Sequence, residues 1–232
     1  MYASSIGSGA TQRGRFMGIQ GSMDRRASRF DLMAVRLLDI GVACCALIFL
    51  APLMIVVACL VYVVDPGPVL FAHRRLGRNG RSFPCLKFRS MVTDAEARLQ
   101  KLLATDADAR AEWARDYKLR RDPRITPIGN FLRKSSIDEL PQLINVLRGE
   151  MSIVGPRPIV EGEIERYGRY FIDYSRVKPG ITGLWQVSGR NNVSYRRRVA
   201  LDVSYARNKC LGLDLRILVM TVPAVFLARG SF

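Results

Sequence analysis

An uncharged apolar segment, residues 40–64, constrains this chain more than any other feature of its sequence. Roughly 20 apolar residues suffice for a helix to cross the hydrocarbon core of a bilayer, and this segment has about 25. We therefore interpret the segment as a membrane helix and not as a helix of a soluble core.

Charges on both sides of the segment indicate how it enters the membrane. Lys and Arg accumulate in cytoplasmic flanks, and both flanks here are basic. Pro52, near the middle, removes a helical hydrogen bond and predicts a bend. We therefore predict a re-entrant helix, with a Pro-kinked spanning helix as the alternative. The flanking cations are Arg25, Arg26, Arg29 and Arg36 before the segment, and Arg74, Arg75, Arg78, Arg81, Lys87 and Arg89 after it.

The side chains available for chemistry are mainly carboxylates and cations. The chain has 232 residues, enough for one catalytic domain with appendages, and a formal net charge of +16. That charge attracts the phosphates of nucleic acids, anionic lipids or nucleotides alike. With His73 as the sole histidine and no C-x-x-C spacing among five cysteines, neither a histidine metal site nor a disulfide framework is expected. We therefore seek the nucleophile among the carboxylates.

The chain divides into three parts by composition. Gly, Ser and Arg dominate the first part, which has no apolar period and is expected to be a disordered arm. A turn cluster, Asp65-Pro-Gly-Pro68, separates the apolar part from the polar one. The predicted parts are a basic arm (1–28), a membrane-embedded helix (29–66) and a catalytic domain with interfacial helices (67–232).

Two further helices are predicted in the third part. Residues 94–117 repeat Ala and Leu at helical spacing. Residues 211–227 are apolar but are interrupted by Asp214, Arg216 and Pro223, which favours an interfacial or docked helix over a membrane span.

Two adjacent carboxylates, Asp138 and Glu139, lie in a stretch that carries cations before and after them. A carboxylate can attack phosphorus covalently while Mg²⁺ and arginines neutralise the phosphate oxygens, and Mg²⁺ takes one or two protein carboxylates. The pair can divide these two roles. The alternative is a capping box, in which Ser136 and Glu139 satisfy the amides at the start of a helix.

Two other segments carry candidate phosphate or nucleotide contacts. Arg157 stands between two prolines that restrict the backbone, which suits a bidentate phosphate contact, and a solvated surface turn is the alternative. Residues 174–191 combine glycines, cations and Trp185 and are a candidate nucleotide wall, although Trp185 is equally consistent with a core position. The run Arg196-Arg197-Arg198 is interpreted as a solvated or lipid-facing basic face.

Five ordered motifs resemble the bacterial sugar transferase family, the monotopic phosphoglycosyl transferases, and the likeness covers residues 30–232. The resemblance implies a mixed α/β, mainly helical, monotopic fold with a re-entrant helix, whose catalytic domain lies at the cytoplasmic face of the bacterial inner membrane. The motifs are Lys87-Phe-Arg89-Ser-Met, Asp122-Pro-Arg124, Asp138-Glu139-Leu140-Pro141, Gly155-Pro-Arg157-Pro and Lys178-Pro-Gly-Ile-Thr-Gly.

The resemblance also implies a chemistry. Asp138 would attack the β-phosphate of a UDP-sugar, expel UMP and form a phosphosugar enzyme, with Glu139 holding Mg²⁺. Undecaprenyl phosphate would then take the sugar phosphate from the enzyme. The implied substrate or phosphate contacts are Arg133 and Arg157, and, with roles less defined, Lys87, Arg89 and Arg124.

Within the family, the chain is similar to the short enzymes that begin exopolysaccharide synthesis in rhizobia, which implies galactose or glucose as the sugar. One departure is Ala51 before Pro52, where some relatives carry serine.

Two rival hypotheses stay open. In the first, the polyprenyl phosphate attacks the nucleotide sugar directly, without an enzyme intermediate. In the second, the chain is a basic membrane-surface or nucleic-acid-binding protein without catalysis. No nucleic-acid module is recognised in the sequence, so nucleic acid is not an expected partner.

Overall fold

The computed structural model describes residues 29–116, 119, 121–189 and 193–226. The fold is mainly helical with two small two-stranded sheets, so it is mixed α/β as predicted. The predicted basic arm, residues 1–28, lies outside the described residues.

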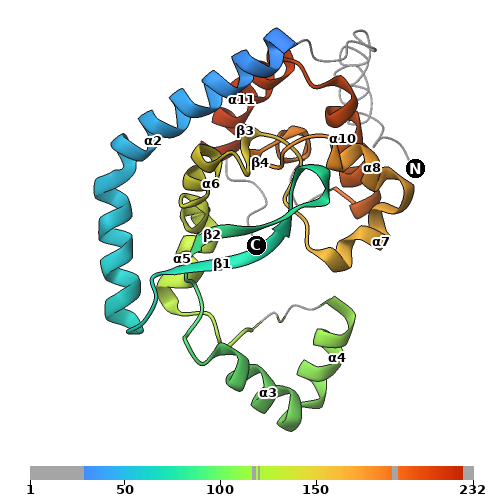
Figure 1. The fold of residues 1–232 in the computed structure, drawn as a ribbon. Helices are drawn as coiled ribbons and strands as arrows, with labels where there is room; N and C mark the ends of the chain where they lie inside the picture. Colours follow the sequence, from blue (N-terminus) through green and yellow to red (C-terminus); the bar gives the residue numbers. More distant parts are fainter. Residues whose placement is uncertain (1–28, 117–118, 120, 190–192, 227–232) are drawn as a thin grey trace, which may run out of the picture.

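The apolar segment lies within one long helix, α2 (Arg29–Val64), which is long and apolar enough to cross a membrane. Pro52 lies inside this helix, so the proline at which we predicted a bend does not break the helix. A proline removes a single N–H from the helical ladder, and the remaining hydrogen bonds continue on both sides. Figure 1 shows α2 changing direction about halfway along its length, as a bend at a proline would produce.

Both halves of α2 pack against the rest of the protein. In the first half, Ala43 belongs to the main core, and in the second, Val57 and Val61 pack with Phe88 and Leu132. The other side of the helix is exposed and apolar. Its most exposed large side chains include Phe30, Leu37, Ile48, Phe49, Ile55 and Val63.

A β-hairpin follows α2. Strand β1 (Leu70–Leu76) pairs antiparallel with β2 (Ser82–Phe88) around the short 3-10 turn η1 (Arg78–Gly80). Phe83 and Cys85 of β2 are buried in the core. Because side chains alternate across a strand, Lys87 projects to the same face as Phe83 and Cys85. This face of β2 therefore carries core side chains at Phe83 and Cys85 and, at Lys87, a side chain that contacts Asp138 and Glu139.

The described part of the predicted helix at residues 94–117 forms two helices and not one, and Tyr117 lies outside the described residues. Helix α3 (Ala95–Thr105) ends at Asp106, and α4 (Ala107–Asp116) begins after it. The Asp106 carboxylate accepts hydrogen bonds from the amides of Asp108 and Ala109, so Asp106 caps the new helix. The predicted single helix was therefore wrong at this residue. Figure 1 shows the two helices projecting away from the rest of the fold.

The second sheet is a parallel pair of β3 (Ser152–Val154) and β4 (Gly180–Thr182), and helix α11 contacts both strands. A Cβ atom on Gly155 would lie 2.6 Å from the Gly180 nitrogen, so glycine is required where these segments cross. The other elements are α5 (Pro127–Ser135), η2 (Ile137–Glu139), α6 (Gln142–Arg148), η3 (Glu161–Glu163), α7 (Ile164–Tyr167), η4 (Gly168–Tyr170), α8 (Phe171–Ser175), α9 (Leu184–Val187), α10 (Tyr195–Asn208) and α11 (Leu211–Phe226).

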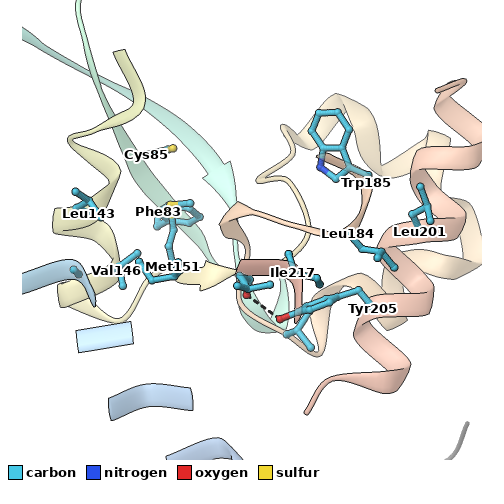
Figure 2. Close-up of a cluster of buried hydrophobic side chains, with 14 residues drawn as sticks. Phe83, Cys85, Leu143, Val146, Met151, Leu184, Trp185, Leu201, Tyr205 and Ile217 are labelled. Atoms are coloured by element: carbon cyan, nitrogen blue, oxygen red, sulfur yellow. Dashed lines mark hydrogen bonds between the residues drawn. The ribbon is translucent and has the colours of Figure 1, made fainter. Parts of the chain in front are cut away.

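The main core joins the hairpin, α6, β3, α9, α10 and α11 (Figure 2). The hydroxyl of Tyr205 donates to Val154 O at 2.8 Å and contacts Asp214 at 2.7 Å, which ties α10 to both β3 and α11. Helix α11 packs against α2 and α9, in agreement with the docked helix predicted for residues 211–227; Leu227 lies outside the described residues.

Candidate active site

The carboxylate pair lies opposite a lysine from the hairpin. The Nζ atom of Lys87 is 2.6 Å from Glu139 Oε1 and 3.7 Å from Asp138 Oδ2. One ammonium therefore contacts both carboxylates, although it lies about fifty residues earlier in the chain. The structure brings three of the predicted site residues together here.

The local backbone places the two carboxylates side by side at a chain reversal. They occupy the 3-10 turn η2, between α5 and α6. Ser136 enters this turn with φ 59°, a left-handed conformation, and its side chain makes no capping hydrogen bond. Because Glu139 contacts Lys87 instead of the turn's first amide, the capping-box alternative is wrong.

Asp138 is the more enclosed member of the pair, with 7% of its surface exposed. Burial raises the pKa of Asp138, the charge of Glu139 adds to this effect, and Lys87 and Arg133 oppose it. The Glu139 side chain is more open to solvent. Asp138 is thus a partly dehydrated carboxylate held next to cations, which suits a nucleophile.

Arg133, in the last turn of α5, acts on Asp138 through its charge. Its Nε atom donates to Ser90 Oγ at 2.8 Å, and its two terminal nitrogens have no partner among the described residues, so they are available to a ligand. Gly129, one turn earlier, allows this approach, since a Cβ atom there would lie 1.9 Å from Ser90 O. Ser90 was not among the residues singled out from the sequence. Its place within the Lys87-Phe-Arg89-Ser-Met motif was the available signal.

Arg157 is exposed on a segment that is fixed at both ends. Before it, Pro156 O accepts a hydrogen bond from Gly180 N at 2.9 Å; after it, Ile159 O accepts one from Leu76 N at 2.9 Å. Within the described part of the chain, the Arg157 guanidinium forms no ion pair. Its side chain is therefore free to bind an anion from a rigid backbone.

The structure places two other predicted contacts away from the pair. Arg89 forms an ion pair with Asp65 at 3.3 Å, so it joins the end of α2 to the end of β2. Arg124 contacts Asp122 at 2.7 Å and stacks over Trp113 at 4.9 Å. The Arg124 guanidinium and the Nη2 atom of Arg89 are therefore engaged by protein partners, whereas Arg89 Nη1 has no hydrogen-bond partner among the described residues.

The basic run on α10 is not uniformly a surface feature. Arg196 and Arg197 are exposed, but Arg198 turns inward and lies over the ring of Trp185 at 4.4 Å. The prediction of a solvated face was therefore wrong for Arg198. Trp185 is buried, as its core interpretation required, and it also stacks with this cation. Arg190, in the predicted nucleotide wall, lies outside the described residues.

The carboxylate pair fits the needs of Mg²⁺. Among the described residues, no group of three or more His, Cys, Asp and Glu side chains converges on one point. A substrate-bound Mg²⁺ needs only one or two carboxylates, since phosphates and water complete its octahedron. The ammonium of Lys87 lies close to both carboxylates, so a cation can be accommodated beside them.

Comparison with known proteins identifies what the chain is similar to. Residues 30–228 match the family described as bacterial sugar transferase. The chain is 50% identical over 200 residues to the exopolysaccharide production protein ExoY of Rhizobium meliloti. The aligned region covers 86% of this chain and 88% of that protein.

Two other relatives are much longer than this chain. Identity is 50% over 216 residues with the undecaprenyl-phosphate galactose phosphotransferase of Salmonella typhimurium, covering 92% of this chain and 44% of that protein. Identity is 39% over 223 residues with the undecaprenyl-phosphate glucose phosphotransferase of Komagataeibacter xylinus, covering 90% and 38%. The chain thus spans less than half of these two relatives.

Proposed function

Because the chain belongs to the bacterial sugar transferase family, we propose that it transfers a hexose 1-phosphate from a UDP-sugar to undecaprenyl phosphate, releasing UMP. Membership confirms the resemblance drawn from the five motifs. The relatives' names add undecaprenyl phosphate as acceptor, galactose or glucose as sugar, and exopolysaccharide production as the setting. The transfer is then the first step of that synthesis.

The observation that carries the proposal is the enclosed Asp138 beside Lys87 and Glu139. In the first step, a carboxylate oxygen of Asp138 bonds to the β-phosphorus, the bond from that phosphorus to the oxygen bridging it to the α-phosphorus breaks, and UMP leaves with that oxygen. In the second step, a phosphate oxygen of undecaprenyl phosphate attacks the same phosphorus. The bond between Asp138 and phosphorus breaks, and the carboxylate is restored.

The surrounding cations support each step. Lys87 favours the ionised form of Asp138, and Arg133 and Arg157 neutralise phosphate oxygens where negative charge accumulates. Glu139 would hold Mg²⁺, which neutralises the diphosphate when bound. Arg89 and Arg124, engaged by Asp65 and Asp122, are assigned to the scaffold of the site.

We also propose that α2 is re-entrant. Near its start, Arg36 donates to Val146 O at 2.7 Å, and just after its end Asp65 pairs with Arg89. Polar groups at both ends therefore contact the same domain, whereas a spanning helix would separate its ends by about 30 Å of hydrocarbon. With basic flanks on both sides, the domain is assigned to the cytoplasmic face of the inner membrane.

Release of UMP tests the activity. Purified protein with undecaprenyl phosphate and Mg²⁺ is expected to release UMP from UDP-galactose or UDP-glucose, and the Asp138→Asn variant is not. Asp173→Asn, which changes a buried carboxylate on α8, is the matched control and is expected to stay active. No UMP from a panel of UDP-sugars would favour the non-catalytic alternative.

Cysteine labelling tests the topology. In a background without native cysteines, Arg25→Cys and Arg81→Cys are expected to react with an impermeant reagent only from the cytoplasmic side. Labelling of the two positions from opposite sides would show that α2 spans the membrane.

A further inference from the structure

Unpaired polar atoms gather on α9 and α10. Within the described part of the chain, five buried side-chain nitrogen or oxygen atoms have no hydrogen-bond partner, and four of them belong to this region. They are Trp185 Nε1, Gln186 Oε1, Arg198 Nε and Asp202 Oδ1. A buried polar atom without a partner is costly, so such a concentration marks a place where a ligand or ordered water can supply the missing hydrogen bonds.

Trp185, Arg198 and Asp202 lie close together, and Gln186 follows Trp185 on α9. Arg198 lies over the Trp185 ring at 4.4 Å, and Asp202 follows one turn later on α10. Tyr167 donates its hydroxyl hydrogen to Asp202 Oδ2 at 2.7 Å, which orients the carboxylate and leaves Oδ1 unpaired. Trp185 is 6% exposed and Asp202 1% exposed. Figure 2 shows the Trp185 indole directed away from Leu184 and Tyr205.

We propose that this cluster, which we call the α9–α10 cluster, binds the hydroxyl groups of the hexose carried by the UDP-sugar. The inference rests on the proposed function and assigns its sugar-binding residues. Trp185 Nε1 and Arg198 Nε donate to sugar oxygens, and Gln186 Oε1 and Asp202 Oδ1 accept from sugar hydroxyls.

The balance of donors and acceptors favours a hexose over uracil. The cluster offers two unpaired donors and two unpaired acceptors, and each sugar hydroxyl can both donate and accept. The uracil edge presents one N–H between two carbonyl oxygens, and a carboxylate facing those oxygens would be repelled. Trp185 already has Arg198 over its ring, so that face is closed to a stacking base.

The position of the cluster relative to Arg157 agrees with this assignment. The charge of Arg157 lowers the pKa of both Arg198 and Asp202. It also lowers the pKa of the Cys85 thiol, on which the charges of Lys87 and Glu139 act as well. Arg157 is therefore within electrostatic reach of the α9–α10 cluster and of Cys85, which lies on the face of β2 that carries Lys87. A hexose bonded to a phosphate at Arg157 would extend toward the cluster.

The test compares Asp202→Asn with wild type in the full chain, in the presence of undecaprenyl phosphate and Mg²⁺. The amide keeps the contact with Tyr167 but turns the unpaired acceptor into a donor. The matched control is Asp214→Asn, since both carboxylate oxygens of Asp214 have partners, Tyr205 and Lys209. Three quantities are measured: KM for UDP-galactose, KM for UDP-glucose, and inhibition by UMP, which carries uridine and a phosphate but no hexose.

We expect Asp202→Asn to raise KM for the preferred sugar about tenfold and to change the ratio between the two sugars, because the acceptor that faces a sugar hydroxyl becomes a donor. The inhibition constant of UMP should stay within about twofold of its wild-type value, because UMP has no hexose to contact Asp202. Weaker UMP inhibition in parallel with KM would place the nucleotide in the cluster and overturn the proposal. Unchanged values throughout would mean that only water fills it.

A second variant keeps the test decisive if Asp202→Asn does not fold. Gln186→Met removes the other unpaired acceptor at a half-buried position and should raise KM for the sugar roughly threefold to tenfold, with UMP inhibition again unchanged. Turnover by wild type tests the proposed function separately: if wild type releases no UMP, that function fails, whereas an active wild type with unaltered variants refutes only the sugar site.

Discussion

Replacing Lys87 with methionine tests how the site keeps its nucleophile ionised. Burial raises the pKa of Asp138, and the lysine opposes that rise from 3.7 Å. At an effective dielectric constant of about 20, two unit charges at this distance attract by roughly 4 kcal/mol. Solvent near the partly exposed lysine reduces the net effect to about 1–2 kcal/mol, or about one pKa unit.

The sign of the pH effect follows from which form attacks. Only the ionised carboxylate is a nucleophile, so the rate rises as pH increases through the pKa of Asp138. Without Lys87 that pKa moves further up, and the acid limb of the rate profile should shift to higher pH by about one unit. The assay is the single-turnover release of UMP from a UDP-sugar between pH 5 and 9, without lipid acceptor.

Lys87→Arg is the matched control, because it keeps the charge and should leave the acid limb near its wild-type position. The plateau rate can fall in both variants if the lysine also contacts phosphate, so the position of the limb is the quantity to compare. An acid limb that stays in place, or moves to lower pH, in Lys87→Met would refute this account of Asp138.

Three other predictions concern single side chains. Arg157→Lys should lower turnover by roughly tenfold or more while thermal unfolding stays unchanged, since an ammonium cannot make a bidentate phosphate contact; wild-type turnover would mark Arg157 as a turn residue. Glu139→Gln should raise the Mg²⁺ concentration needed for half-maximal UMP release, and an unchanged Mg²⁺ titration would exclude Glu139 as the metal ligand. Burial raises the pKa of Asp202 to about 7, so the native protein should lose stability as pH rises from about 4 to 7, by at most about 1.4 kcal/mol per pH unit. Asp202→Asn should flatten this dependence in thermal unfolding measured at pH 5 and pH 8, and equal slopes in both proteins would contradict the assignment.

Features that depend on local sequence were predictable. The uncharged apolar run specifies a long helix, and the turn after Val64 separates it from the polar domain. Prolines on both sides of Arg157 predict a restricted backbone, and the structure holds that segment between Gly180 and Leu76. The adjacent carboxylates were recognised as a candidate pair because two neighbouring acids among cations suit phosphoryl chemistry.

Features that depend on tertiary contacts were not predictable from the pattern. Lys87 and Glu139 are 52 positions apart, and only the packing of the hairpin on α5 and α6 brings them together. The inward turn of Arg198 requires the ring of Trp185 beneath it, whereas a run of three arginines by itself indicates a solvated face. Asp106 could have been recognised from the sequence as the start of a new helix, because Asp is favoured at the N-cap position. The helical pattern of Ala and Leu continues across it, however, and therefore indicated one helix.

The central claim is that Asp138 forms a covalent bond to phosphorus. Mass spectrometry of the peptide that contains Asp138 tests it most directly. Wild-type protein incubated with the UDP-sugar and Mg²⁺, without undecaprenyl phosphate, should gain the mass of a hexose phosphate on the peptide that contains Asp138, and the adduct should disappear when the lipid is added. Asp138→Asn should show no adduct and no turnover. An adduct on another residue would contradict the account by identifying a different nucleophile. A fully active Asp138→Asn variant without an adduct would contradict it in favour of direct attack by the lipid phosphate.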